Sequence, residues 1–209
     1  MVLNFLERFF PNSCTSCGAR IPVRNFLCEH CENQIKGPLL ENFSISYINK
    51  TYAFWWYEPP MNDLIKAYKF QGRFRLAEQF AEMLFKMIFK FNIDGTIIPV
   101  PTTFSALRKR GFDTNALILK KLNRKLDITV LNALTALRRP MPQSRLSGND
   151  RVISVKGKFQ LVNSTLKLPE RVILFDDVIT TGATVSECAK ILKSNGVIEI
   201  IGISLAKSH

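Results

Sequence analysis

The sequence predicts an α/β protein whose mostly parallel sheet follows a small N-terminal module with four cysteines. Stretches typical of strands alternate with stretches typical of helices along the second half of the chain, and this order produces a parallel sheet. Hydrophobic residues make up 46% of the 209 residues, enough for one well-buried domain and a small appendage. Four of the five cysteines lie within 18 residues near the N-terminus. We therefore expect two units, a cysteine module over residues 1–40 and an α/β domain over residues 41–209.

The first ten residues have apolar side chains at helical spacing, namely Val2, Phe5, Leu6, Phe9 and Phe10. This pattern predicts a short amphipathic helix that ends at Pro11. Glu7 and Arg8 interrupt the apolar run that a signal peptide needs, and no stretch reaches the roughly 20 apolar residues that span a bilayer. We expect a cytoplasmic protein without a transmembrane segment.

The cysteines form two Cys-x2-Cys pairs, Cys14 with Cys17 and Cys28 with Cys31. Each such turn points two thiolates at one centre, and two turns complete the tetrahedron that Zn²⁺ accepts. In a reducing cytoplasm a metal site is favoured over disulfides. His30 lies inside the second pair, but four cysteines already supply the ligands. A closed four-thiolate site leaves no open position for a substrate, so we expect the zinc to be structural.

The body of the chain opens with a stretch rich in β-branched and aromatic residues, 44–57, which predicts one or two strands. These aromatics could stack on nucleic-acid bases, but in strands they belong more often to the core. Helical spacing follows from Met61 to Tyr68 and again from Leu76 to Phe91. The chain then alternates between strands expected at 96–100, 128–131, 171–175 and 198–205 and helices expected at 114–125 and 183–194. Cys188 lies on the apolar side of the last helix and is expected to be a buried small residue.

Positive charge is concentrated in one segment. The chain carries a net charge of +12, and residues 101–160 hold 13 of the 29 Lys and Arg but only 3 of the 17 Asp and Glu. Within this segment, residues 138–158 predict a long basic loop. Such a concentration indicates a surface that faces nucleic acid or a multiply phosphorylated small molecule. A scattered solubilising surface is the alternative, and it does not predict this clustering.

The most specific pattern is the run from Arg171 to Thr184, RVILFDDVITTGAT, in which a buried strand, two acids and a hydroxyl-rich turn precede a helix. Backbone N–H groups and the positive end of the helix meet at such a turn and form an anion site. Gly182 would let the backbone approach a ligand, and hydroxyl donors come from Thr180, Thr181 and Thr184. Asp176 and Asp177 can accept from sugar hydroxyls or act near a bound Mg²⁺. A capped helix without a ligand is the alternative. Neither a P-loop sequence nor a G-x-G-x-x-G sequence is present.

This run resembles the signature of type I phosphoribosyltransferases, and four further segments resemble the ComF family of competence proteins. These are Leu64-Ile-Lys-Ala-Tyr-Lys-Phe-Gln-Gly-Arg, Ile98-Pro-Val-Pro, Arg110-Gly-Phe-Asp and Pro142-Gln-Ser-Arg-Leu-Ser. The resemblance implies a Rossmann-like sheet of the type I phosphoribosyltransferase kind joined to a zinc module, and a role in DNA uptake during natural transformation.

The resemblance also implies roles for individual residues. Asp176 and Asp177 would meet the ribose, and the 5′-phosphate would lie on Thr180, Thr181, Gly182, Ala183 and Thr184. The pyrophosphate of phosphoribosyl pyrophosphate, with its Mg²⁺, would lie on the turn with Thr102 and Thr103. Asp113 stands where the family usually has Asn, and it places a negative charge beside the expected anion site.

The basic residues leave two functions open. Arg108 and Arg110 could bind pyrophosphate, as in an active nucleotide-salvage phosphoribosyltransferase with Asp176 and Asp177 as catalytic residues. The same basic segment could instead bind single-stranded DNA, through Lys109, Arg138, Arg139, Arg145 and Arg151. The family resemblance favours the DNA-uptake role, with DNA-uptake machinery proteins as partners. A regulator that senses phosphoribosyl pyrophosphate is a third alternative.

Overall fold

A parallel sheet of four strands lies at the centre of the computed structural model, which describes residues 12–35, 43–125, 128–138 and 157–208. The strand order is β3-β8-β7-β4, and each neighbouring pair is parallel. The strands are β3 (Lys50–Trp56), β4 (Thr96–Pro99), β7 (Arg171–Ile179) and β8 (Glu199–Lys207). The expected mostly parallel sheet is confirmed. The helix expected over the first ten residues lies outside the described residues, as do Arg139, Arg145 and Arg151.

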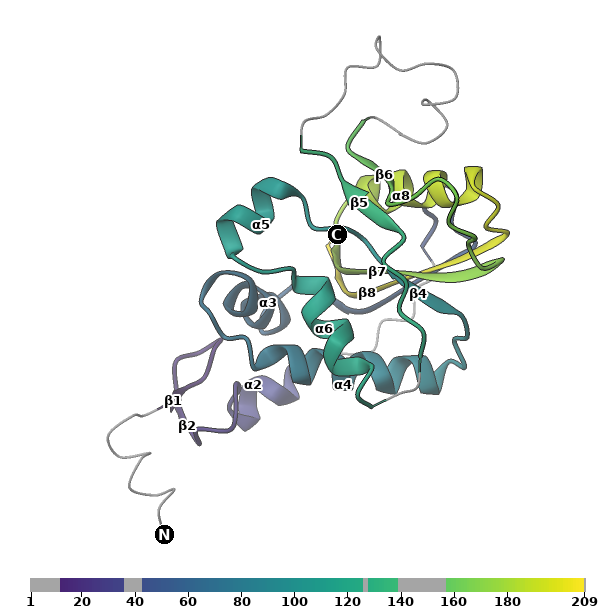
Figure 1. The fold of residues 1–209 in the computed structure, drawn as a ribbon. Coiled ribbons are helices and arrows are strands. Elements are labelled where there is room, and N and C mark those ends of the chain that lie inside the picture. The colour runs from purple at the N-terminus through teal and green to yellow at the C-terminus, as the bar shows by residue number, and fades with distance from the viewer. Residues whose placement is uncertain (1–11, 36–42, 126–127, 139–156, 209) are drawn as a thin grey trace.

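Helices cover both faces of the sheet (Figure 1). Successive side chains of a strand point to opposite faces, so Ile173 and Phe175 of β7 enter one apolar cluster while Val172 and Leu174 enter the other. The first cluster is closed by α3 (Met61–Phe70), α4 (Leu76–Lys90) and α6 (Thr114–Leu122). The second is closed by α8 (Ala183–Ser194) and by the antiparallel pair β5 (Leu134–Ala136) and β6 (Phe159–Leu161).

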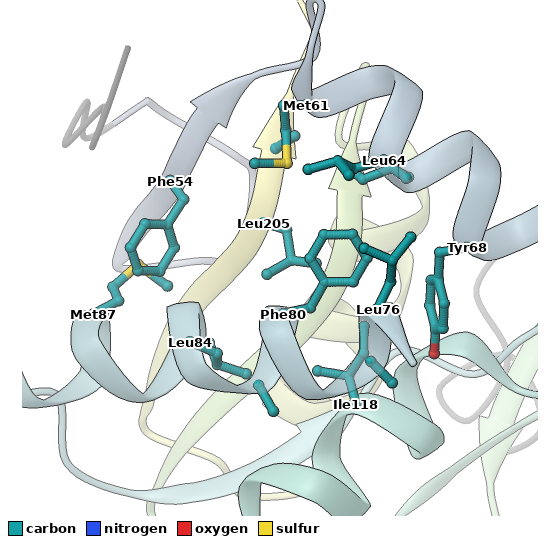
Figure 2. Packing of buried hydrophobic residues seen from close by; sticks show 14 of the residues in the cluster. Phe54, Met61, Leu64, Tyr68, Leu76, Phe80, Leu84, Met87, Ile118 and Leu205 are labelled. Atoms are coloured by element: carbon teal, nitrogen blue, oxygen red, sulfur yellow. The ribbon is translucent and has the colours of Figure 1, made fainter. Parts of the chain in front are cut away.

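The helical spacing read from the sequence matches the buried side of α3 and α4. Figure 2 shows Leu64 of α3, Phe80 and Leu84 of α4, and Leu205 of β8 packed together, and all four are fully or almost fully buried. Burial of large apolar side chains contributes about 1.5–3 kcal/mol each, which fixes the two helices on the sheet. No helix in the described ranges has the length and apolarity needed to cross a membrane.

Three elements differ from the sequence prediction. The strand expected at 128–131 is only a single bridge between Val130 and Ile97, in which the Ile97 amide donates to the Thr129 carbonyl and the Leu131 amide donates to the Ile97 carbonyl. A helix not predicted, α5 (Phe104–Arg110), follows β4, and none of its residues is buried. The β5–β6 pair was also not predicted, because its two strands lie far apart in the sequence and no short turn joins them.

The cysteine module packs against the start of α3 and the α3–α4 junction. It contains β1 (Asn12–Ser13), β2 (Arg20–Ile21) and α2 (Glu29–Asn33). Ser16 Oγ donates to Asp63 Oδ2 at 2.7 Å, and Arg73 Nη1 donates to Thr15 Oγ1 at 3.0 Å. Leu27 is buried in the same apolar cluster as α3 and α4. The module is therefore anchored to the body by polar and apolar contacts together.

Candidate anion-binding site

The turn between β7 and α8 is open to solvent. Its exposed residues are Thr180, Thr181, Ala183 and Thr184. Within the described chain, the Ala183 amide donates to Thr181 Oγ1 at 3.4 Å, and the amides of Thr181, Gly182 and Thr184 have no protein acceptor. Unused amides at the start of a 12-residue helix can accept an anion, because the helix dipole adds positive potential there.

Gly182 is required at this turn for a reason that the sequence does not reveal. Its φ is +76°, in the left-handed region that other residues avoid. A Cβ added to it would lie 3.0 Å from Cδ1 of Ile45. A side chain at position 182 would therefore point at Ile45. It would not point into the space where a ligand was expected.

The two acids lie inside β7, not at its end. β4 ends opposite Phe175, whereas β7 continues to Ile179, so Asp176 and Asp177 extend beyond β4. Asn115 of α6 closes this edge: its Nδ2 donates to the Val100 carbonyl at 3.0 Å and to Asp176 Oδ1 at 3.1 Å. Asn115 thus links the carboxyl end of β4 to the acidic pair.

The two carboxylates have different surroundings. Lys69 Nζ of α3 donates to Asp177 Oδ1 at 2.6 Å, and the two side chains are only 12% and 7% exposed. Asp176 Oδ1 accepts from the Asp177 amide at 2.9 Å as well as from Asn115. Asp177 is therefore a buried, ion-paired group, whereas Asp176 is held by neutral donors.

Burial raises the pKa of Asp176 to about 7, and the negative charge of Asp177 adds to this shift. The hydrogen bond from Asn115 and the charge of Lys69 act in the opposite direction but do not cancel it. The pKa of Tyr57 is also raised, by burial and by the nearby charges of Asp177 and Asp63. Near neutral pH, Asp176 can therefore exist in both protonation states, as an acceptor when ionised and as a donor when protonated.

The turn after β4 lies at the same edge of the sheet as the acids, since Asn115 joins them. Thr102 and Thr103 are half-buried there. Thr103 also begins α5, because its Oγ1 accepts from the Ala106 amide at 3.4 Å. Asp113 has a comparable task at the start of α6, where its Oδ1 accepts from the Ala116 amide at 2.9 Å. The carboxylate of Asp113 is thus engaged in capping a helix.

The basic residues of α5 share their surface with exposed aromatic rings. We use the term α5 surface for Phe70, Phe104, Leu107, Arg108, Lys109, Arg110 and Arg138. Phe70 is 54% exposed, and Lys109 Nζ and Arg110 Cζ each lie 5.4 Å from its ring centroid. Arg138 Cζ lies 5.7 Å from the centroid of Phe104, with Leu107 and Arg108 lining the same hollow. Among the described residues, none of these four cations forms an ion pair.

Arg108 and Arg110 were expected at the pyrophosphate, and the structure puts both on α5. No hydrogen bond among the described residues joins either of them to the turn of Thr102 and Thr103. Lys69 and Asn115 are site residues that were not predicted from the sequence. Lys69 lies within the segment 64–73 and Asn115 lies two residues after Asp113, so both are in or next to segments that resemble the family. Neither their spacing nor their residue type shows that their partners are Asp177 and Asp176.

The four expected zinc ligands come together. The Sγ atoms of Cys14, Cys17, Cys28 and Cys31 all lie within 4.8 Å of one another, a spacing that one tetrahedral ion can bridge. Burial raises the pKa of Cys14, but hydrogen bonds from the backbone at Cys17 and neighbouring positions outweigh this effect and lower it to about 6. His30 lies outside the cluster, with its Nε2 3.0 Å from Gln34 Nε2. Cys188 is fully buried in α8, as expected.

Comparison with known proteins gives several relatives. Competence protein F of Haemophilus influenzae is 31% identical over 97% of this chain and 100% of its own length. Competence protein ComFC of Streptococcus pneumoniae is 25% identical over 96% of this chain and 83% of its own. DNA utilization protein YhgH of Escherichia coli K12 is 30% identical over 67% of this chain and 64% of its own. No model of a protein family matches the chain.

Solved structures overlap more loosely. Adenine phosphoribosyltransferase of Thermoanaerobacter pseudethanolicus has a TM-score of 0.44 at 18% identity, over 86% of this chain and 98% of its own. UMP synthase of Leishmania donovani has a TM-score of 0.37 at 14% identity, over 85% of this chain and 29% of its own. Neither overlap is close enough to support an inference about this chain.

Proposed function

The chain belongs to the competence protein F family, and from this membership we propose that it serves DNA uptake in natural transformation by binding a phosphorylated ribose and single-stranded DNA. Two relatives are named as competence proteins and another as a DNA utilization protein, which supports the DNA-uptake role. Proteins of the DNA-uptake machinery would be its partners. The four-cysteine cluster would hold a structural zinc ion.

The observation that carries the ribose-phosphate proposal is the open turn between β7 and α8. The unused amides of Thr181, Gly182 and Thr184 would bind the 5′-phosphate, with the hydroxyls of Thr180, Thr181 and Thr184 beside them. The acidic pair, a few residues earlier in β7, would meet the ribose hydroxyls.

Phosphoribosyl pyrophosphate is the ligand that these parts fit best as a set. Its pyrophosphate would lie toward Thr102 and Thr103, on the far side of Asn115 from the turn. When bound, Mg²⁺ would neutralise part of the pyrophosphate charge. The acids, the amides and Asn115 themselves would bind and orient the sugar.

The α5 surface supports the DNA proposal. A single strand presents both phosphates and unstacked bases, so it favours a surface where cations alternate with exposed rings. Arg108, Lys109, Arg110 and Arg138 supply the cations, and Phe70 and Phe104 supply the rings. α5 contains no acidic residue, so the charges of Arg108, Lys109 and Arg110 are not balanced within the helix. Arg139, Arg145 and Arg151 would extend this surface.

Replacing Ala183 tests the ribose-phosphate proposal. Ala183→Glu puts a carboxylate at the exposed first position of α8, where the phosphate would bind, and an acid at a helix N-terminus does not destabilise the helix. Ser194→Glu adds the same charge at the other end of α8 and is the matched control. We expect Ala183→Glu to weaken binding of phosphoribosyl pyrophosphate at least about tenfold in calorimetry, a change of about 1.4 kcal/mol. Equal affinity for the two variants would refute the site.

A further inference from the structure

We infer that Lys69 is a built-in counter-cation of the acidic pair, so that the pair recognises ribose without holding a divalent metal ion. The inference rests on the proposed ribose-phosphate site and assigns a positioning role to Lys69. It also gives Asp176 and Asp177 different surroundings, Asn115 for Asp176 and Lys69 for Asp177, although the sequence offered no distinction between the two acids.

Asp177 is too buried for a hydrated metal ion while Lys69 is paired with it. Its Oδ1 accepts from Lys69 Nζ at 2.6 Å, and its Oδ2 is fully buried with no hydrogen-bond partner among the described residues. Mg²⁺ binds carboxylate oxygens at about 2.0–2.1 Å and keeps several of its water ligands, which need open space around the carboxylate. With the Lys69 ammonium group 2.6 Å from Oδ1, a side chain that is 7% exposed does not provide that space.

Asp176 alone is a weak ligand for a hard cation. One of its oxygens already accepts two hydrogen bonds, from Asn115 and from the Asp177 amide. Because its pKa is raised to about 7, a proton competes with any cation near neutral pH. The pair as a whole therefore does not fit Mg²⁺, whereas an ionised or protonated Asp176 suits a sugar hydroxyl, which is both donor and acceptor.

Lys69 is held in place by the helix that carries it. The neighbouring Tyr68 is fully buried, and its hydroxyl donates to the Thr114 carbonyl at 2.8 Å, one residue before Asn115. At the other end of α3, Asp63 accepts from Ser16 of the cysteine module. Since α3 is fixed at both ends, the ammonium group stays at the acidic pair before any ligand arrives. In the described chain, the charges facing this ammonium group are those of Asp177 and, at longer range, Asp176.

Two measurements test the inference. The first is calorimetry of ribose 5-phosphate on the full-length wild-type chain with its zinc bound, in buffer freed of Mg²⁺ by a chelating resin before the protein is added, and then in the same buffer with Mg²⁺. We expect affinities that agree within about twofold, about 0.4 kcal/mol. Loss of binding in the Mg²⁺-free buffer with recovery on addition of Mg²⁺ would overturn the inference.

The second measurement is a titration with Mn²⁺ alone. Binding is measured as the loss of the free Mn²⁺ signal in electron paramagnetic resonance. Lys69→Gln should create a Mn²⁺ site that wild type lacks, and Asp177→Asn in the same chain should remove it. Lys66→Gln, which changes an exposed lysine of the same helix, should bind no Mn²⁺ and is the matched control. Mn²⁺ binding by wild type that Asp177→Asn abolishes, or no gained site in a folded Lys69→Gln chain, would overturn the inference.

The double variant Lys69→Gln with Asp177→Asn removes both buried charges together and guards against a variant that does not fold. It should remain folded and bind no Mn²⁺; Mn²⁺ binding by the double variant would show that the gained site does not use the Asp177 carboxylate and would contradict the role of Lys69. If wild type binds neither ribose 5-phosphate nor phosphoribosyl pyrophosphate under any condition, the proposed function fails, and the Mn²⁺ measurement still decides the role of Lys69.

Discussion

Ile45 fills the space that a side chain at Gly182 would need, with its Cδ1 3.0 Å from the position of a Cβ there. A residue from the segment before β3 thus supports the turn that starts α8. Gly182 is buried against Ile45, whereas Thr180, Thr181, Ala183 and Thr184 are exposed.

Gly182→Ala should lower the free energy of unfolding by at least about 1–2 kcal/mol, because alanine at a φ of +76° is strained and its Cβ also meets Ile45. Chemical denaturation measures this cost. Ile45→Val removes Cδ1, so the same Gly182→Ala change should cost less in an Ile45→Val background. An identical cost in both backgrounds would show that the contact with Cδ1 of Ile45 contributes nothing.

The raised pKa of Asp176 predicts that the fold loses stability as pH rises. Its folded pKa of about 7 exceeds the ordinary value of 3.8, so the folded state holds a proton that the unfolded state has released. This contribution is fully present below about pH 4 and is lost as pH rises through about 7. Urea denaturation at a series of pH values should therefore show a smaller decline for Asp176→Asn than for wild type. The exposed Asp94→Asn should decline as wild type does, and a wild-type slope in Asp176→Asn would contradict the assignment.

Phe104→Ala should weaken binding of an oligo-dT strand by about 1–3 kcal/mol, the usual effect of losing one stacked base. Fluorescence anisotropy of a labelled strand measures this loss. The salt dependence of binding should not change, because no phosphate contact is removed. Phe89→Ala is the control, since Phe89 is 77% exposed on α4 and outside the α5 surface. Equal losses in both variants would remove Phe104 from the DNA surface.

Arg138→Gln should instead change the salt dependence. Each phosphate contact on a single strand contributes a slope of about −0.7 in a plot of log affinity against log salt, so the slope should become shallower by roughly that amount. An unchanged slope would mean that Arg138 contacts no phosphate.

One zinc ion per chain should be released by a strong chelator, with loss of thermal stability in the whole protein, because the cysteine module packs on α3 through Ser16 and Arg73. Cys17→Ser should lower the zinc content measured by metal analysis. Cys188→Ala should keep it, since Cys188 lies in α8 outside the thiol cluster. Zinc retained in Cys17→Ser would contradict the four-thiolate site.

Local patterns predicted the parts of the fold that depend on neighbouring residues. The apolar run before Asp176 and the hydroxyl-rich turn after it predicted β7 and α8, and α8 begins and ends at the expected residues, Ala183 and Ser194. The spacing of the four cysteines likewise predicted that their thiols come together. These features lie within a few residues of chain, where residue type and period are sufficient.

The parts that the sequence could not predict depend on distant residues. Lys69 and Asp177 are 108 residues apart and form an ion pair only because α3 packs on the face of the sheet toward which Asp177 points. α5 has no buried residue, so its apolar pattern gives no signal of a helix packed on a core. A strand was expected at 128–131, but among the described residues it pairs with the sheet only through the bridge between Val130 and Ile97. The number of residues that pair with a neighbouring strand depends on the path of the chain, which residue type does not give. Gly182 was interpreted as a ligand contact because the packing of Ile45 cannot be read from the sequence.

The central claim is that the turn after β7 binds the phosphate of a sugar. Its most direct test is a titration of the ¹⁵N-labelled chain with ribose 5-phosphate, followed by amide resonances. We predict that the amides of Thr181, Gly182, Ala183 and Thr184 shift most, with inorganic phosphate producing smaller shifts of the same amides. If the largest shifts lie elsewhere while these four amides stay unchanged, the claim is wrong.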